Sequence, residues 1–520
     1  MAKSLSIKII LPLFKQKTKE GLEAWKKKIA KREKIAMFSN SSLLKIYYSL
    51  LKKKKIRKNK NLERILRKRP IRSLSGVVNI SVLTKPYPCP GRCLFCPQEK
   101  GLPKSYLSKE PAVERAKALF FSPLKQTKKR IEDLKKCGHK TEKIELRIIG
   151  GTFSSYPKSY QRSFIKKIFE GANQKKSKNL KEAQKKNEKA ENKIVSLSVE
   201  TRPDFINEKE IKNFRELGIT KVELGVQTIF DDILSFVKRG HSSKEIIWAT
   251  KILKDAGFKV SYQVMPNLPG SDLNKDFLMF FHLFENEKFK PDYLKIYPLV
   301  LFKNTPLFSL FKKGKFFLYS KEELKNLIKK VKEIVPFWLR IERIVRDFPQ
   351  PNSQISNLRQ EIQKEMEKEK RECHCLRCRE IKENYNREEK IYLFRDDYFA
   401  SGGKEIFLSF ETKDRKKILS FLRLRIPSYF FENKKPIFSV LKKASLIREI
   451  KTLGQLTGLK EKKINVQHQG LGKRLIRIAE KISRQEFKLE KTAIISGIGV
   501  RNYFRKLGYK LSETYMVKNI

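Results

Sequence analysis

Three cysteines, Cys89, Cys93 and Cys96, lie within the stretch CPGRCLFCP of the 520-residue chain. The stretch follows the β-rich run VVNISVLTKP, so we expect it on a loop at the end of a strand. Three thiolates spaced C-x3-C-x2-C can each bind one iron of a cubane [4Fe-4S] cluster. Because no fourth cysteine is nearby, one iron would stay open to a substrate or cofactor. A zinc site and three unrelated thiols are the alternatives.

A second group of cysteines, Cys373, Cys375 and Cys378, is spaced C-x-C-x2-C. Thiolates suit a tetrahedral structural zinc, and a second iron–sulfur cluster is the alternative. The sequence does not determine the fourth ligand, for which His374 and a remote residue or water are the candidates. The other histidines, at positions 139, 241, 282 and 468, show no metal-binding spacing, and we expect them at the surface or in packing roles.

A glycine loop near the C-terminus has the pattern Q-x-x-G-x-G and opens the helix-like run KRLIRIAEKI. Its residues are Gln467, Gly470, Leu471, Gly472 and Lys473. Backbone N–H groups at the start of a helix can bind a pyrophosphate, although capping turns look similar. The loop stands between SLIREIKTLG and NYFRKLGY, and this order fits the acyl-CoA site of GCN5-related N-acetyltransferases (GNAT).

In the GNAT fold a strand backbone pairs with the pantetheine arm of the cofactor. That strand corresponds here to Glu449, Ile450, Lys451 and Thr452. Tyr503 is then placed to donate a proton to the departing thiolate, and simple packing at a helix start is its alternative role.

Composition limits the class of protein that can carry these motifs. Lys and Arg number 118 against 56 Asp and Glu, a formal net charge of +62, while 40% of residues are hydrophobic. Such a chain folds and attracts a polyanion, although a lysine-rich genome would also give an excess of this kind. No apolar run is long enough to span a membrane and no signal peptide is indicated. We therefore expect a cytoplasmic protein without a membrane partner, whose thiols bind metals.

The chain divides into four predicted domains or zones. Residues 1–75 are basic and mostly helical in pattern, and include LKKKKIRKNKNLERILRKRPIR, which has the composition of a nucleic-acid-binding arm or of a solvated helix. Residues 76–350 alternate β-rich and helical runs, which predicts a parallel, barrel-like sheet. Residues 351–395 form a linker with the second cysteine group, and residues 396–520 form a compact α/β module.

The strand ends of the barrel should meet at one mouth, because active sites of such barrels lie at the C-terminal ends of the strands. The expected strands end at Cys89, Gly150-Gly151, Glu200, Gln227, Met265-Pro266 and Tyr297. A glycine pair after a strand permits close approach of a ligand, although it is more often a turn. The lysine-rich stretch 173–193 is expected to be an exposed helix or loop without a chemical role.

These features resemble known families. The cysteine spacing, with Phe95 before the last cysteine, resembles radical SAM enzymes. A radical SAM barrel joined to a GNAT module resembles the catalytic subunit of Elongator, the tRNA carboxymethyluridine synthase family. The resemblance covers about 70–520 and rests on LTKPYPCPGRCLFCP, EKIELRIIGGTFSSYP, VETRPDF, LGVQTIFDDIL, RGHSSKE, MPNLPGS, LKIYPLV, RIVRDFP, CHCLRCRE, FRDDYFASGGKEIFLSFE, QHQGLG and ISGIGVRNYFRKLGY. The expected fold is α/β, a partial radical SAM barrel plus a GNAT-type domain.

The resemblance implies a reaction at the wobble uridine of tRNA. A deoxyadenosyl radical from S-adenosylmethionine would take a hydrogen from the methyl of acetyl-CoA, the carbon would add to C5 of uracil, and thioester hydrolysis would leave 5-carboxymethyluridine. The residues implied are Cys89, Cys93 and Cys96 for the cluster, Lys143, Leu471–Lys473 and Glu449–Thr452 for acetyl-CoA, and Lys295 and Tyr297 as active-site lining. The anticodon stem-loop would bind the basic arm and the barrel mouth.

Two departures from the family pattern are visible. The family usually has two tyrosines where this chain has Tyr503 and Phe504, so the ring of Phe504 can pack on CoA but offers no hydroxyl. The first two cluster cysteines are closer together than in eukaryotic members, which should not weaken iron binding.

Rival functions are a protein lysine N-acetyltransferase with a structural barrel, a different radical SAM tRNA modifier such as a methylthiotransferase, and a non-catalytic tRNA-binding module. A methylthiotransferase has no reason to carry the glycine loop.

The sequence does not determine which tRNAs are substrates, the electron donor, or whether accessory Elongator-like subunits or a homodimer are needed.

Overall fold

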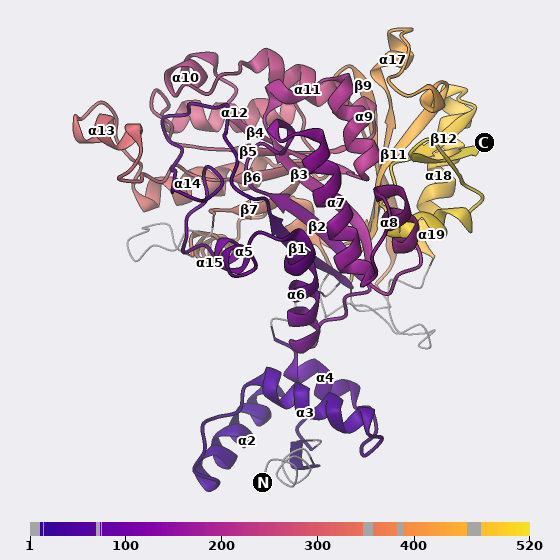
Figure 1. The fold of residues 1–520 in the computed structure, drawn as a ribbon. Helices are drawn as coiled ribbons and strands as arrows, with labels where there is room; N and C mark the ends of the chain where they lie inside the picture. The colour runs from indigo at the N-terminus through magenta and orange to yellow at the C-terminus, as the bar shows by residue number, and fades with distance from the viewer. Residues whose placement is uncertain are drawn as a thin grey trace.

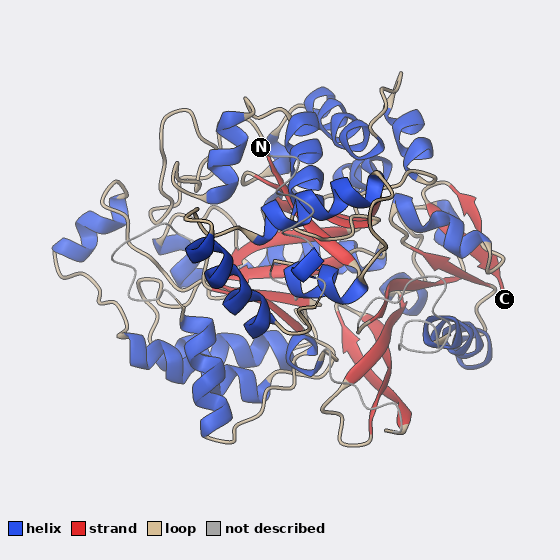
Figure 2. Ribbon diagram, turned by 90° about the horizontal axis from the view of Figure 1, so that it is seen from below, coloured by secondary structure: helices blue, strands red, loops and turns tan. Residues whose placement is uncertain are grey.

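The computed structural model describes residues 11–13, 15–68, 73, 75–346, 357–381, 389–454 and 470–520. It contains an N-terminal helical unit and two seven-stranded sheets (Figure 1). Helices surround the first sheet, and the second sheet lies beside it at the C-terminal end of the chain (Figure 2). Within the described ranges, no helix has the length and apolar character needed to cross a membrane.

The N-terminal unit is a small helical bundle with its own core. Its helices are α2 (Lys19–Arg32), α3 (Asn40–Lys52) and α4 (Lys60–Leu66), and side chains of Thr18, Ser39 and Asn59 cap their first turns. The core is separate from the rest of the protein and contains Leu13, Leu22, Trp25, Ile29, Leu43, Leu44, Tyr47, Leu50, Leu62, Ile65 and Leu66. The unit projects from the body next to α6 (Figure 1).

The first sheet is a parallel half-barrel with strands in chain order. Its strands are β1 (Val77–Leu83), β2 (Lys143–Ile149), β3 (Lys193–Thr201), β4 (Lys221–Gln227), β5 (Lys259–Val264), β6 (Tyr293–Ile296) and β7 (Arg340–Ile344). The first six lie where the β-rich runs predict them. The seventh was not predicted, because RIERI has three charged residues and only two apolar ones, Ile341 and Ile344, and so has no apolar run.

Helices connect the strands and cover the outside of the half-barrel (Figure 1). They are α5 (Pro111–Ala118), α6 (Pro123–Lys136), α7 (Lys158–Asn173), α8 (Leu180–Asn187), α9 (Glu208–Leu217), α10 (Asp231–Phe236), α11 (Ser243–Asp255), α12 (Leu273–Glu285), α13 (Pro306–Lys312) and α14 (Lys321–Ile334). This is the architecture that repeated strand–helix alternation predicts.

The lysine-rich stretch 173–193 differs from the expectation of an exposed segment. It contains α8, whose last residue, Asn187, is fully buried. The amide of Asn187 donates to the backbone carbonyl of Asn192 and accepts from the backbone N–H of Ile194. Lysines cover only the outer face, so the segment is the helix that was one of the two expectations, and its inner face is buried.

The second sheet follows α15 (Leu358–Lys368) and α16 (Leu376–Arg379). Its order is β13-β14-β12-β11-β10-β9-β8, with β8 (Ile391–Ala400), β9 (Gly403–Thr412), β10 (Ile418–Ile426), β11 (Ala444–Thr452), β12 (Lys491–Ile494), β13 (Lys510–Ser512) and β14 (Tyr515–Asn519). Only the β11–β12 pair is parallel among its paired strands. The helices are α17 (Ser428–Phe431), α18 (Leu471–Phe487), which packs on β10 and β11, and α19 (Arg501–Arg505).

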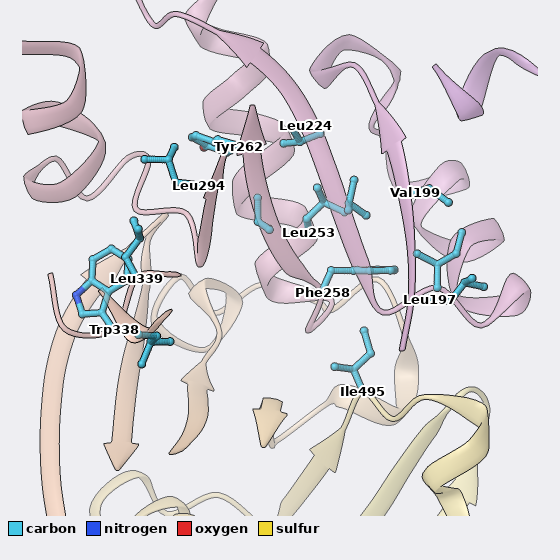
Figure 3. Close-up of a cluster of buried hydrophobic side chains, with 14 of the residues drawn as sticks. Leu197, Val199, Leu224, Leu253, Phe258, Tyr262, Leu294, Trp338, Leu339 and Ile495 are labelled. Atoms are coloured by element: carbon cyan, nitrogen blue, oxygen red, sulfur yellow. The ribbon is translucent and has the colours of Figure 1, made fainter. Parts of the chain in front are cut away.

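One hydrophobic core runs through both sheets. Figure 3 shows Phe258 of the half-barrel module above Ile495 of the second module, with Trp338 nearby. Trp338 also stacks on Tyr398 of β8 with ring centroids 4.5 Å apart. The two sheets are therefore packed together as one body, and the N-terminal bundle has a core of its own.

Candidate active site and metal centres

The first cysteine group lies on the loop that follows β1, at the C-terminal end of the barrel strands. Cys93 is buried, whereas Cys89 and Cys96 are half-buried. The backbone N–H of Leu94 donates to Val237 O at 3.1 Å, and Leu94 O accepts from the N–H of Leu307 at 3.1 Å. The end of α10 and the start of α13 thus fix the loop between them.

Gly150 and Gly151 follow β2 at the same mouth. Their φ angles are 137° and 88°. A Cβ atom on Gly150 would lie 1.9 Å from Thr84 Oγ1, so only glycine fits there. Glycine is thus required here by the Thr84 side chain, and close approach of a ligand to Gly150 and Gly151 stays a prediction.

Glu200 and Gln227 lie at the ends of β3 and β4. Glu200 accepts hydrogen bonds from Tyr106 Oη at 2.8 Å and from Gln263 Nε2 at 3.3 Å. Gln227 has a φ of 72° next to an irregularity in the β4–β5 register. Both polar side chains thus belong to the mouth, together with half-buried Tyr297, whose N–H donates to Val264 O at the end of β5.

The barrel interior below the mouth is charged. Fully buried Lys295 of β6 donates to Glu223 of β4, and Arg147 Nη2 of β2 lies 3.0 Å from the same carboxylate. Burial alone would raise the pKa of Glu223, but Arg147, Lys295 and Lys221 hold it well below its ordinary value. Lys295 is therefore an ion-paired cation, and Tyr297 is the accessible member of the two predicted lining residues.

Lys143 lies at the other end of the barrel. It is the first residue of β2 and pairs in register with Lys193, the first residue of β3. Lys143 is exposed at this edge, and partial desolvation together with the neighbouring charge of Lys193 lowers its pKa. At this end Tyr293, the first residue of β6, donates to Glu449 of β11, so the second module meets the barrel at the strand starts.

Of the residues predicted to bind acetyl-CoA, Ile450, Thr452 and Tyr503 lie beside Gly472 at the start of α18. Parallel pairing of β11 with β12 covers Ala444–Ile447, so the β12-facing edge of residues 448–452 has no strand partner in the described part of the chain. A Cβ on Gly472 would lie 3.5 Å from Thr452 Oγ1, 3.6 Å from Ile450 Cδ1 and 3.6 Å from Tyr503 Oη. Gly470 precedes α18 in a left-handed conformation, and α18 has no side-chain cap.

The remaining residues of this group divide between surface and core. Lys473 is exposed and Leu471 is buried in the first turn of α18. Lys451 O accepts from Ser420 Oγ, and Tyr293 and Arg423 bind the side chain of Glu449, so these two groups are already hydrogen-bonded within the protein. Gln467 lies outside the described residues.

Tyr503 and Phe504 have different environments. Tyr503 is 39% exposed, and burial of the rest of its side chain raises its pKa. Phe504 is 3% exposed and packs edge-to-face on Tyr503, with centroids 5.1 Å apart. Phe504 therefore supports Tyr503 from the core, and Tyr503 presents the hydroxyl.

The helix that carries Tyr503 is held by the half-barrel. Glu188, just after α8, accepts from Arg501 Nη1 at 3.3 Å and from Arg505 Nη1 at 2.6 Å. Its backbone carbonyl accepts from Asn502 Nδ2 at 3.1 Å. One residue of the lysine-rich stretch therefore fixes both ends of α19.

The second cysteine group is compact. The sulfurs of Cys373, Cys375 and Cys378 lie within 4.8 Å of one another, and no fourth His, Cys, Asp or Glu of the described chain joins them. Zn–S bonds of about 2.3 Å in tetrahedral geometry place sulfurs about 3.8 Å apart, which fits this group. The ring of His374 instead packs on Phe337 with centroids 4.8 Å apart. Lys332 Nζ lies 3.6 Å from Cys378 Sγ.

The first group has the properties of a multi-iron site. Among the described residues, its sulfurs do not form a set within 4.8 Å, which is too open for one tetrahedral ion. Arg239 Nη1 donates to Cys93 Sγ at 3.4 Å, and buried Arg202 Nη1 has no hydrogen-bond partner in the described structure. Burial, Arg239 and Arg202 lower the pKa of His241 to about 3, so this imidazole is neutral. Three thiolates beside two cations fit an anionic iron–sulfur cluster.

Sequence reasoning did not identify Arg202, Arg239, Glu223 or Glu188. Arg202 and Arg239 stand in VETRPDF and RGHSSKE, each directly after a strand or helix that borders the mouth. A charged residue directly after an element that borders the mouth is a signal that could have identified both arginines. Glu223 and Glu188 gave no signal, because their partners lie far away in the sequence.

Comparisons with known proteins agree with this geometry. Residues 87–282 match the radical SAM superfamily, and residues 291–368 match the radical SAM C-terminal domain. The tRNA uridine(34) acetyltransferase of Methanocaldococcus infernus is 44% identical over 500 residues, covering 93% of this chain and 91% of that protein. Human Elongator complex protein 3 is 36% identical over 476 residues, covering 87% and 86%. The solved structure of archaeal Methanocaldococcus infernus Elp3 with an N-terminal deletion superposes with a TM-score of 0.74 at 40% identity, covering 86% of this chain and 100% of that one.

Proposed function

The chain belongs to the family of the tRNA uridine(34) acetyltransferases and Elongator complex protein 3, and on this premise we propose that it converts the wobble uridine of tRNA to 5-carboxymethyluridine, using acetyl-CoA as the carbon donor. The observation that carries the proposal is the junction of the two modules. Strand β11, whose open edge begins after Ile447, is bonded to the barrel through Glu449 and Tyr293. The barrel interior beyond that junction contains the ion pairs of Glu223 with Arg147 and Lys295 and of Glu342 with Lys221.

Cys89, Cys93 and Cys96 would hold the cluster, with Gly150, Gly151, Glu200 and Gln227 around S-adenosylmethionine. When bound, these cofactors supply a one-electron cleavage that allows hydrogen abstraction from an unactivated carbon. The chain orients the reactants and limits access of water. Buried Cys93 and the fixed backbone at Leu94 keep the loop in one conformation, and the glycines permit close approach of the ligand.

The second module would bind acetyl-CoA through its backbone. N–H groups at the start of α18 would face the pyrophosphate, and the free edge of residues 448–452 would pair with the pantetheine arm. Tyr503 Oη lies beside the same helix turn. It would give its proton to the thiolate when the thioester is cleaved. Burial raises the pKa of Tyr503, so its hydroxyl carries the proton at neutral pH.

Glu188 should affect acetyl-CoA binding to the second module, because it holds α19, the helix that carries Tyr503. Replacing Glu188 with Gln removes the charge that Arg501 and Arg505 share. Hydrogen bonds to charged groups contribute about 1.5–3 kcal/mol, so we expect acetyl-CoA binding to weaken by roughly one to two orders of magnitude. Isothermal titration calorimetry with acetyl-CoA measures this. Glu191→Gln, which removes an exposed carboxylate paired only with Lys135, is the matched control and should bind normally. Equal affinity in both variants would contradict the role of Glu188.

The N-terminal bundle would bind the tRNA backbone. Lys52–Lys55 are exposed between α3 and α4 and follow one another in the chain. Replacing all four with Gln should weaken tRNA binding and lower the salt dependence, by about 0.7–0.9 in the log–log slope for each lost phosphate contact. Filter binding at several salt concentrations measures both quantities. An unchanged slope would place the tRNA contacts elsewhere.

A structural zinc is proposed for Cys373, Cys375 and Cys378. Lys332 of α14 lies beside Cys378, so the zinc site would hold α14 against the linker that precedes the second sheet. Replacing Cys375, which is 1% exposed, with Ser should release one zinc per chain and leave the iron content unchanged. Mass spectrometry of the metals in wild-type and variant protein distinguishes the sites. If iron is lost instead of zinc, the second group holds a cluster.

The function is tested by mass spectrometry of nucleosides from tRNA. The reconstituted protein is incubated anaerobically with tRNA, S-adenosylmethionine, acetyl-CoA and dithionite, and each component is omitted in turn. The proposal predicts 5-carboxymethyluridine only in the complete mixture. Unmodified tRNA, together with acetylation of an added lysine peptide that needs no S-adenosylmethionine, would instead favour a protein acetyltransferase.

A further inference from the structure

Two buried guanidinium groups lie beside the cysteine loop. Arg202 follows β3 and Arg239 follows α10, and they are 5% and 7% exposed. Burial of a charged side chain is costly unless it is paired, so a pair of buried arginines needs an anionic partner. The carboxylate bonded to them is Asp204, which binds Arg202 alone. The arginines therefore carry more positive charge than this carboxylate balances.

Arg239 is directed at one particular thiol. Its Nη1 donates to Cys93 Sγ at 3.4 Å, and its Nη2 donates to Gly225 O at 2.6 Å. The second bond ties the guanidinium to β4, so the side chain cannot rotate away without leaving a buried carbonyl unpaired. Cys93 is itself the most buried of the three ligands. Arg239 thus joins the rigid sheet to the loop.

Arg202 is directed at another part of the same loop. Asp204 accepts from its Nε at 2.9 Å and its Nη2 at 3.0 Å, and Gly240 O accepts from Nη2 at 3.0 Å. These contacts leave Nη1, which is buried and has no protein partner in the described structure. A Cβ on Gly91 would lie 2.4 Å from Nη1 and 3.6 Å from Cys89 Sγ. The free N–H group therefore points at the turn between the first two cysteines.

We propose that Arg239 and Arg202 are positioning residues of the cluster, which fix the loop at Cys93 and at Gly91 and raise the reduction potential of the bound iron. The inference rests on the proposed function. Reduction adds one electron from an external donor to a cluster that is already anionic, and no bond forms or breaks in that step. Nearby cations and N–H···S hydrogen bonds stabilise the more negative state. Removing them therefore makes the cluster harder to reduce.

The test is a redox titration of the reconstituted holoenzyme, followed by the electron paramagnetic resonance signal of the reduced cluster. In Arg239→Gln, which keeps the size but removes the charge, we expect the ratio of reduced to oxidised cluster at a fixed potential to fall about tenfold. For a one-electron couple this is about 59 mV. Arg239→Lys, which keeps the charge, should recover most of the shift. Lys238→Gln removes the same charge from an exposed neighbouring side chain and should leave the potential unchanged.

The outcomes separate the inference from the proposed function. A wild-type potential in Arg239→Gln, or an equal shift in Lys238→Gln, would overturn the inference and leave the cluster site intact. Failure of the wild-type protein to assemble a four-iron cluster would overturn both. If Arg239→Gln does not fold, the same titration is made on Arg202→Gln, where an unchanged potential would overturn the inference and a lower one would support it.

Discussion

Replacing Cys93 with Ser should abolish formation of 5-carboxymethyluridine. Cys93 is 8% exposed and receives a hydrogen bond from Arg239, so the loop offers no nearby substitute ligand. A serine hydroxyl does not ionise at neutral pH and binds iron poorly. The loss should exceed the roughly 10- to 100-fold that changes in outer-shell partners cause. Iron content and nucleoside mass spectrometry of the reconstituted variant measure the two consequences.

The matched control for this variant is Cys137→Ser. Cys137 belongs to neither cysteine group and ends α6, where its backbone N–H bonds to Asp133 O. The same chemical change there should leave iron content and product formation near wild-type values. A Cys93→Ser protein that still forms the modified nucleoside would show that the loop is not the radical centre.

The second large effect is expected at the interface between the sheets, where Arg448→Met should destabilise the whole protein. Arg448 is fully buried and binds Asp292 after α12 and Glu405 of β9. Burial alone would raise the pKa of Asp292, but Arg448 and Lys254 hold it well below its ordinary value. Removing one partner of a buried pair costs about 3–5 kcal/mol, because it leaves uncompensated charge. Thermal unfolding followed by circular dichroism should show a lower midpoint.

Arg395→Met provides the comparison for Arg448→Met. Arg395 also binds two carboxylates, Asp397 and Glu486, but its side chain is 35% exposed. Exposed ion pairs contribute at most about 1 kcal/mol, so its midpoint should hardly change. Equal effects of the two substitutions would mean that the buried network does not hold the sheets together.

The sequence predicted the parts of the fold that local pattern determines. Six of the seven barrel strands follow from β-rich runs, whereas β7 is short and charged. A helix was one of the two expectations for the lysine-rich stretch, but the burial of its inner face at Asn187 was not predicted. Periodicity and composition describe a segment by itself and carry no information on what covers it.

The candidate site was likewise predictable only where its residues lie close together in the sequence. The cysteine ligands follow from spacing within eight residues, and the glycine loop from its place before a helix. The contacts within the site do not follow from the sequence. Arg239 and Cys93 are 146 positions apart, and Lys295 and Glu223 are 72 apart. Such pairs exist only after the strands have been brought into one sheet, so the folded structure is needed to find them.

The central claim is that one chain uses acetyl-CoA and a radical centre for a single reaction on tRNA. The most direct measurement is nucleoside mass spectrometry after reaction with acetyl-CoA that carries carbon-13 in both acetyl carbons. The account predicts 5-carboxymethyluridine that is heavier by both labelled carbons, only when S-adenosylmethionine and reductant are present. Unlabelled product, or label found on protein lysines and never on uridine, would contradict it.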